Sequence, residues 1–200
     1  MAGWAQLEGQ ALRLPRDGID TDQLIPARFM ARPRAEGYGD LLLYDLRRTS
    51  DGNLDPAFPL NGAAAPILIA GRDFGTGSSR EAAVYALVDA GIRAVLAPSF
   101  GDIFAGNAGN NGLLTAVLLP DMLEGLGDVL RIDLEAKTIT SGAQRIPFPL
   151  DGVTQQKLIN GWDDIDLTLS HTSAINAHRA QIPQWVWPRH DNQPGPVNDP

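Results

Sequence analysis

The sequence predicts an α/β fold with a mixed, partly parallel sheet flanked by helices, and two observations support this prediction. Between residues 65 and 119, three short apolar runs alternate with two helical patterns, which indicates the order strand, helix, strand, helix, strand. Strands connected in this way pair in parallel through right-handed crossovers. Between residues 129 and 150, apolar and polar residues alternate among turn residues, which indicates two or three antiparallel strands.

The elements of the parallel part follow one another closely. The predicted strands are 65–71, 92–99 and 113–119, each a short apolar run. A helical stripe over 83–88 ends at a glycine, and a second short helix lies within 99–112, opened by a serine with an aspartate three residues later and closed at Asn-Gly.

The remaining segments are assigned more coarsely. Residues 4–14 alternate as expected of a first strand, and 31–65 form a long, irregular, partly ordered insertion. After residue 152 we expect two short helices with an extended piece at Ile165–Leu169. One domain is predicted over 1–187, followed by a disordered tail at 188–200, which is polar and rich in proline.

Composition excludes several classes of protein. The net charge of -8 argues against nucleic-acid binding, which requires a basic surface. The chain has no cysteine, so it forms no disulfide and supplies no thiolate to zinc or to an iron–sulfur cluster. Its three histidines lack the spacing of a helical zinc site, and we predict no metal site. No signal peptide or membrane-length apolar run is evident, so the expected location is cytoplasmic.

The stretch GRDFGTGSSREAA, residues 71–83, allows two interpretations. Ser78 followed by Glu81 fits a capping box, in which the serine is the N-cap and the glutamate closes the reciprocal hydrogen bond. Local pattern alone favours this structural interpretation. Arg80 fits it poorly, because a cation in the first helical turn costs roughly 0.3–1 kcal/mol.

The second interpretation is a binding site for an anion. A helix start that follows a strand presents free N–H groups, and the glycines allow the backbone to approach a ligand. Arg80 is suited to grip a carboxylate bidentately, and Ser78 is a candidate base if nearby N–H groups stabilise its alkoxide. Walker, dinucleotide-binding and nucleophile-elbow patterns all fail here, since the lysine or the required glycines are absent.

Five motifs, in the same order, resemble the small subunit of bacterial 3-isopropylmalate dehydratase, a family related to the swivelling C-terminal domain of aconitase. The resemblance spans nearly the whole chain. The motifs are DGIDTDQLIPARFM, EGYGDLLLYDLR with DPAFPLN, GTGSSRE, AVLAPSFGDIF with NNGLL, and WDDIDLTLSH.

The resemblance implies a swivelling β/β/α domain and a hydro-lyase that is active only with a separate large subunit, as a heterodimer or heterotetramer. That partner is expected to contain the [4Fe-4S] cluster, with no cofactor bound by this chain. The reaction implied is the isomerisation of 2-isopropylmalate and 3-isopropylmalate by dehydration and rehydration, in leucine biosynthesis.

The resemblance also assigns roles to residues. Ser78 is implied as the base that removes a proton from carbon, with Asp22 beside it as a second catalytic residue. Ser79 and Arg80 are implied to bind substrate, Arg80 through a carboxylate. Thr21 and Asp20 complete the expected substrate-binding set by shaping the loop.

The chain departs from the family pattern at four positions. Thr76 and Ala108 replace cysteines, Ala82 replaces a histidine and Thr115 replaces a proline. Two alternatives therefore stand beside the main hypothesis. One is a paralogous small subunit for another hydroxy diacid, of methylmalate/citraconate or homoaconitate type; the other is a non-catalytic interaction module with a vestigial site.

Overall fold

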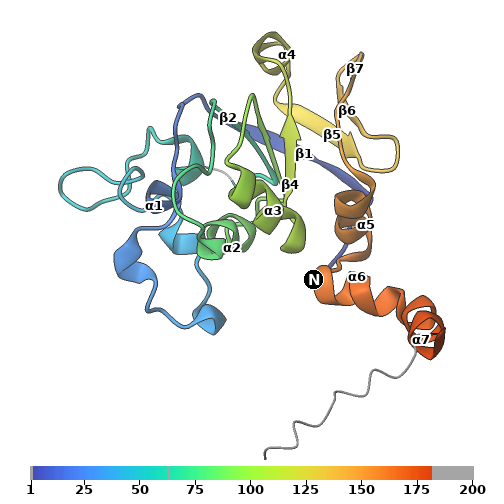
Figure 1. The fold of residues 1–200 in the computed structure, drawn as a ribbon. Helices are drawn as coiled ribbons and strands as arrows, with labels where there is room; N and C mark the ends of the chain where they lie inside the picture. Colours follow the sequence, from blue (N-terminus) through green and yellow to red (C-terminus); the bar gives the residue numbers. More distant parts are fainter. Residues whose placement is uncertain (1, 63, 182–200) are drawn as a thin grey trace, which may run out of the picture. The chain divides into compact units, whose positions relative to one another are not determined.

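One seven-stranded mixed sheet organises the chain, in the order β4-β3-β2-β1-β5-β6-β7 (Figure 1). This computed structural model describes residues 2–62 and 64–181. β1 pairs in parallel with β2, β2 with β3 and β3 with β4, whereas β5, β6 and β7 continue from β1 in antiparallel pairs. The predicted fold class is confirmed. The strands are β1 Gln6–Leu14, β2 Ile67–Ala70, β3 Ala94–Ala97, β4 Leu114–Val117, β5 Val129–Asp133, β6 Thr138–Ser141 and β7 Gln144–Pro147.

The two central strands of the parallel half, β2 and β3, are buried on both faces. Every residue of β2 and β3 is buried, and alternate residues of β2 enter two different core clusters. Leu68 packs with helices α2 (Glu81–Asp89) and α3 (Asp102–Asn110), whereas Ile67 packs on the opposite face. That face is covered by α4 (Pro120–Glu124) and α5 (Gly152–Asn160). The period-2 alternation of strand side chains therefore produces two cores from one apolar run.

The long segment, residues 21–62, follows β1 and lies on the side of α2, away from β5–β7 (Figure 1). It begins with α1 (Thr21–Leu24) and continues through four short 3-10 turns. The turns are η1 Ala27–Phe29, η2 Arg34–Glu36, η3 Gly39–Leu41 and η4 Pro59–Asn61. Arg34 fastens the segment to α2, because its guanidinium pairs with Asp89 at 2.6 Å and lies 4.3 Å from the ring centroid of Tyr85.

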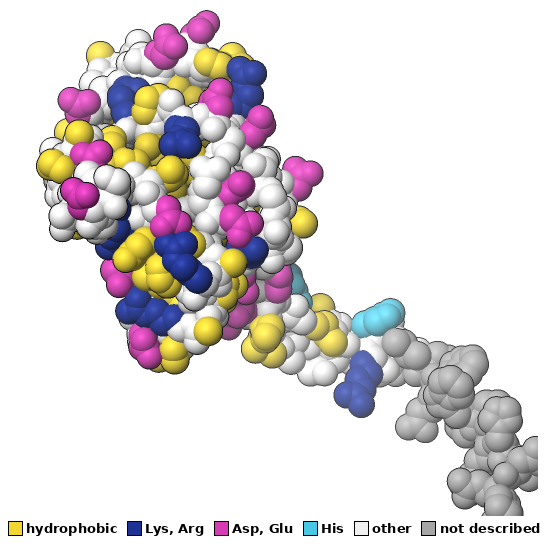
Figure 2. All heavy atoms as spheres, turned by 90° about the vertical axis from the view of Figure 1, so that its left-hand side faces the viewer, with side chains coloured by type: hydrophobic (Ala, Val, Ile, Leu, Met, Phe, Trp, Pro, Cys, Tyr) yellow, Lys and Arg dark blue, Asp and Glu magenta, His cyan; other side chains and the backbone are white. Residues whose placement is uncertain are grey.

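Charged side chains of both signs are interspersed on this face (Figure 2). Arg28 pairs with Asp45, and Arg32 pairs with Asp40 at 3.0 Å. The segment is thus held partly by ion pairs at its own surface, each of modest individual strength because it is exposed to solvent.

Contacts divide the chain into two units, residues 1–167 and 168–200. The first contains the sheet; the described part of the second contains the end of α6 (Asp164–Ser170) and α7 (Thr172–Gln181). The expected extended piece at Ile165–Leu169 is wrong, because these residues are helical in α6. The predicted tail at 188–200 lies outside the described residues. Over residues 2–62 and 64–181, no helix has the length and apolar character needed to cross a bilayer.

Candidate functional site

Two loops run side by side where the parallel strands β1 and β2 end. The N–H of Gly75 donates to the carbonyl of Ile19 at 2.7 Å, and the N–H of Thr21 donates to the carbonyl of Thr76 at 2.9 Å. Since β1 and β2 are parallel neighbours, these bonds extend their pairing beyond the strands. The Asp-Thr-Asp segment and the Gly-Ser-Ser-Arg segment, 57 residues apart at Thr21 and Ser78, are therefore adjacent.

Thr21 ties the two loops together through its side chain. Its hydroxyl donates to the carbonyl oxygen of Ser78 at 3.0 Å, and the residue is only 1% exposed. Asp20 is the N-cap of α1, where its carboxylate accepts the N–H of Gln23 at 2.7 Å. Asp20 and Thr21 thus have partners within the protein, and these contacts shape the loop that presents Asp22.

Asp22 and Arg80 form an ion pair across the two loops. The Asp22 side chain is about half exposed at 52%, whereas the Arg80 side chain is 22% exposed. The pair engages one terminal nitrogen of the guanidinium. Because a guanidinium has five N–H donors in a planar fork, Arg80 keeps donors for a second carboxylate while it contacts Asp22.

The loop between β2 and α2 depends on two glycines in the left-handed region. Gly75 has φ +74° and Gly77 has φ +96°. A Cβ at Gly75 would lie 2.2 Å from the ring of Phe104, so the α3 side chain fills the space that a larger residue needs. No local sequence pattern links Phe104 to position 75, so this contact could not be predicted from the sequence.

The predicted capping box is wrong. Helix α2 begins at Glu81, its N-cap is Arg80, and no side chain caps it. Ser78 therefore lies outside the helix, and the Glu81 carboxylate accepts a hydrogen bond from the side chain of Asn111 at 2.8 Å instead. The expected cap at Ser99 is also wrong, since α3 begins at Asp102 with Gly101 as its N-cap.

Ser78 and Ser79 are exposed at the entrance to α2. Among the described residues, neither hydroxyl has a hydrogen-bond partner, and the N–H groups of Ser78, Ser79 and Arg80 donate to none of them. Free N–H groups just before a helix, together with a guanidinium, suit an anion. The arrangement can therefore bind a carboxylate and stabilise negative charge on an oxygen atom.

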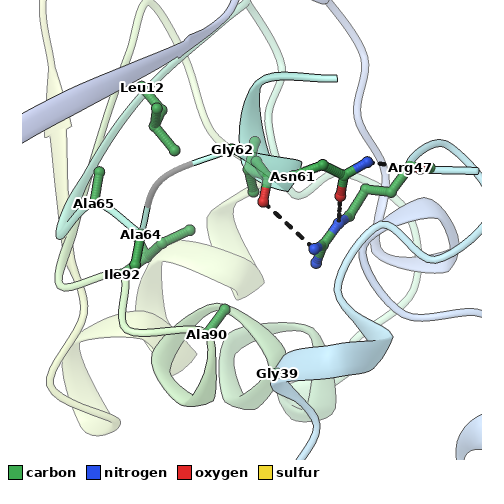
Figure 3. A pocket seen from close by; sticks show the side chains of 10 residues that line it. Leu12, Gly39, Arg47, Asn61, Gly62, Ala64, Ala65, Ala90 and Ile92 are labelled. Carbon is green, nitrogen blue, oxygen red and sulfur yellow. Dashed lines mark hydrogen bonds between the residues drawn. The ribbon is translucent and has the colours of Figure 1, made fainter. Parts of the chain in front are cut away.

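A cavity of about 300 Å³ lies elsewhere in the molecule, beneath the long segment (Figure 3). Leu12, Ala90 and Ile92 line its apolar part, and Arg47 donates to the side chain of Asn61 at 2.7 Å at its edge. Burial lowers the pKa of Arg47 from its ordinary value. The cavity includes none of the residues of the paired loops, so it is separate from the candidate site.

No group of three or more His, Asp or Glu side chains suited to a metal ion occurs in the described part of the chain. Together with the absence of cysteine from the sequence, this leaves the chain without the thiolate ligands that an iron–sulfur cluster requires. The candidate site is thus a set of hydroxyl, carboxylate, guanidinium and backbone N–H groups.

The fold and the paired loops define a class of protein. The family described as "Aconitase C-terminal domain" matches residues 1–120, which include β1–β4 and both loops of the site. A solved structure of 3-isopropylmalate dehydratase from Methanocaldococcus jannaschii superposes with a TM-score of 0.64 at 27% identity. The match covers 87% of this chain and 99% of that chain.

Sequence relatives narrow the class. The 3-isopropylmalate dehydratase small subunit of Clavibacter michiganensis is 41% identical, covering 90% of this chain and 91% of its own. That of Parafrankia sp. is 43% identical, covering 89% and 94%, and that of Leifsonia xyli is 42% identical, covering 92% and 96%. The chain belongs to the family of 3-isopropylmalate dehydratase small subunits, which confirms the resemblance found in its motifs.

Proposed function

We propose that this chain is the small subunit of a hydro-lyase that interconverts 2-isopropylmalate and 3-isopropylmalate, and that it works with a separate large subunit. Family membership supports this reaction. Relatives named 3-isopropylmalate dehydratase small subunit are 41–43% identical to this chain over about nine-tenths of its length. The adjacency of the Asp-Thr-Asp and Gly-Ser-Ser-Arg loops supports a catalytic subunit, because it assembles acid, hydroxyl and cation at one point.

The reaction removes a proton from one carbon and a hydroxyl group from its neighbour, then adds water back in the opposite sense. In our proposal Ser78 accepts the proton. A serine hydroxyl is a very weak acid, so its alkoxide needs strong stabilisation. This stabilisation comes from the N–H groups of Ser79 and Arg80, which donate to no other described residue. The N-terminal dipole of α2 adds to it.

Arg80 binds a substrate carboxylate in this scheme, and Asp22 holds the guanidinium in place through one terminal nitrogen. The hydroxyl of Ser79 lies beside Ser78 in the exposed loop and is free to donate to the same substrate group. Asp20 and Thr21 act by fixing the loops, Asp20 as the cap of α1 and Thr21 through the carbonyl of Ser78.

Removal of the substrate's hydroxyl group requires a partner subunit. A [4Fe-4S] cluster bound by the large subunit would act as a Lewis acid on the departing hydroxyl. This chain lacks the thiolates to hold such a cluster and supplies the proton-transfer side of the site. The complete site therefore forms only in the complex, as a heterodimer or heterotetramer.

The test is co-expression with a cysteine-bearing large subunit from the same genome. The chain alone should be inactive and colourless, whereas the complex should show cluster absorbance and interconvert the two isopropylmalates. Ser78→Ala should abolish turnover while leaving substrate binding largely intact. A cluster-loaded complex without turnover on isopropylmalate, or one that prefers citraconate or homoaconitate, would contradict the proposal.

A further inference from the structure

Asp73 and Ser99 form two reciprocal hydrogen bonds at the base of the loop that leads to Ser78. The N–H of Asp73 donates to the hydroxyl oxygen of Ser99 at 2.8 Å, and that hydroxyl donates to the Asp73 carboxylate at 2.6 Å. Asp73 has φ +59°, in the left-handed region that few residues other than glycine, asparagine and aspartate adopt. The two bonds hold the backbone in that conformation. We refer to them as the Asp73–Ser99 clasp.

Further hydrogen bonds fix the turn formed by residues 73–76. The hydroxyl of Thr76 donates to the carbonyl of Asp73 at 3.1 Å. The N–H of Phe74 donates to the carbonyl of Ser99 at 3.1 Å, and the N–H of Gly101 donates to the carbonyl of Phe74 at 2.9 Å. Phe74 itself is fully buried. Residues 73–76 are thereby joined to the connection between β3 and α3.

We propose that Asp73 and Ser99 are positioning residues for the reaction, acting on Ser78 through the glycine-rich loop. This inference rests on the proposed function. Gly75 and Gly77 allow many backbone conformations, so the place of Ser78 depends on the bonds that hold the loop at its ends, together with those of Gly75 and Thr76 to the neighbouring loop. Thr21 holds the far end at the carbonyl of Ser78, and the clasp holds the near end.

The first test is Ser99→Ala in the complex with the large subunit. We expect kcat to fall by about 10- to 100-fold, the range for misplacement of a reacting group by about an ångström, with KM little changed. Ser99→Thr keeps the hydroxyl and should restore most of kcat. Ser141→Ala is the matched control, since the Ser141 hydroxyl also accepts a backbone N–H at 2.8 Å, that of Gly127, in the antiparallel half. It should leave kcat unchanged.

The second test is a double-mutant cycle. Asp73→Gly tolerates the positive φ but removes the carboxylate, so it should lower kcat as Ser99→Ala does. The double variant should lose no more than Ser99→Ala, because Ser99→Ala already removes both bonds of the clasp. A wild-type kcat in Ser99→Ala, additive losses in the cycle, or an equal loss in Ser141→Ala would overturn the inference.

Failure of the proposed function gives a different result. In that case the wild-type complex, with its cluster intact, does not convert isopropylmalate. The clasp is then tested in the full chain alone by amide hydrogen exchange at Gly75, whose N–H donates to Ile19. Ser99→Ala should accelerate that exchange about 10-fold or more if the clasp fixes the loop. Unchanged exchange would overturn the inference whatever the substrate.

Discussion

Replacing Thr21 by valine removes one hydroxyl from the interface between the two loops and preserves the shape of the side chain. The hydroxyl donates to the carbonyl of Ser78, and the residue is 1% exposed. The backbone bond from the N–H of Thr21 to Thr76 is kept in the variant. The change therefore isolates the hydrogen bond that fixes the backbone of the proposed base.

The expected loss of stability is small. A hydrogen bond of this kind contributes about 0.5–1.5 kcal/mol net, and Ser78 is exposed, so water can hydrate the carbonyl once it is released. For a chain of this size, 1 kcal/mol corresponds to roughly 2–4 °C in Tm. The expected loss of activity is larger, about 10- to 100-fold in kcat, because the reacting hydroxyl is no longer held.

Thr21→Ser is the matched control. It keeps the hydroxyl but removes one buried methyl group, which costs about 1 kcal/mol, so its stability should resemble that of the valine variant. Thermal unfolding of the chain and steady-state kinetics of the complex then separate the two effects. We expect the two variants to have similar Tm values. Only Thr21→Ser should have a kcat near that of the wild type. Equal losses of kcat in both variants would refute the positioning role of the hydroxyl.

Three further predictions address binding, backbone geometry and acid stability. Arg80→Lys keeps the charge but loses the bidentate fork, so KM should rise about 10-fold or more with Tm unchanged; an unchanged KM would contradict carboxylate binding by Arg80. Gly75→Ala should destabilise the chain by about 2–4 kcal/mol in urea unfolding, because it combines a left-handed φ with a Cβ 2.2 Å from a phenylalanine ring. Gly142→Ala, at φ +56° with open space around it, should lose only about 1–2 kcal/mol; equal losses would show that the ring yields. Hydrogen bonds from the side chain and N–H of Thr154 hold the pKa of Asp151 below its ordinary value, so its stabilising contribution is complete above about pH 4 and is lost as pH falls through the lowered pKa. Asp151→Asn keeps a capping oxygen but has no charge to titrate, so the variant should lose less stability in acid than wild type; superimposable acid unfolding curves would contradict this.

The sheet could be predicted because its signals are local. Each parallel strand is a short apolar run, and its boundaries in the structure lie within a few residues of the predicted ones; β3, for example, is Ala94–Ala97 within the predicted 92–99. The glycine-rich loop of the site could also be predicted from local pattern, since glycines, serines and an arginine after a buried strand are an unusual combination, whereas the Asp-Thr-Asp loop was expected only from the family resemblance. What local pattern could not provide is the pairing between them, because Thr21 and Ser78 are 57 residues apart.

The departures from the family pattern also have a structural place. Ala82 and Ala108 are buried, at 6% and 0% exposure, in one core cluster with α2 and α3. The resemblance implies a histidine at the first position and a cysteine at the second. Each change therefore belongs to the packing beneath the helices, whereas Ser78, Ser79 and Asp22 keep their exposed positions.

The start of α2 at Glu81, three residues after Ser78, explains how the site is arranged. A capping serine uses its hydroxyl oxygen to accept a helical N–H, and that oxygen is then unavailable as a base. Here α2 begins at Glu81, and the hydroxyl of Ser78 has no partner among the described residues. Glu81 is held instead by Asn111. The late helix start also moves Arg80 out of the first turn, where a cation would be unfavourable, to a position beside Asp22. Both features that fit a simple helix start poorly, a free serine and an arginine, follow from this one shift.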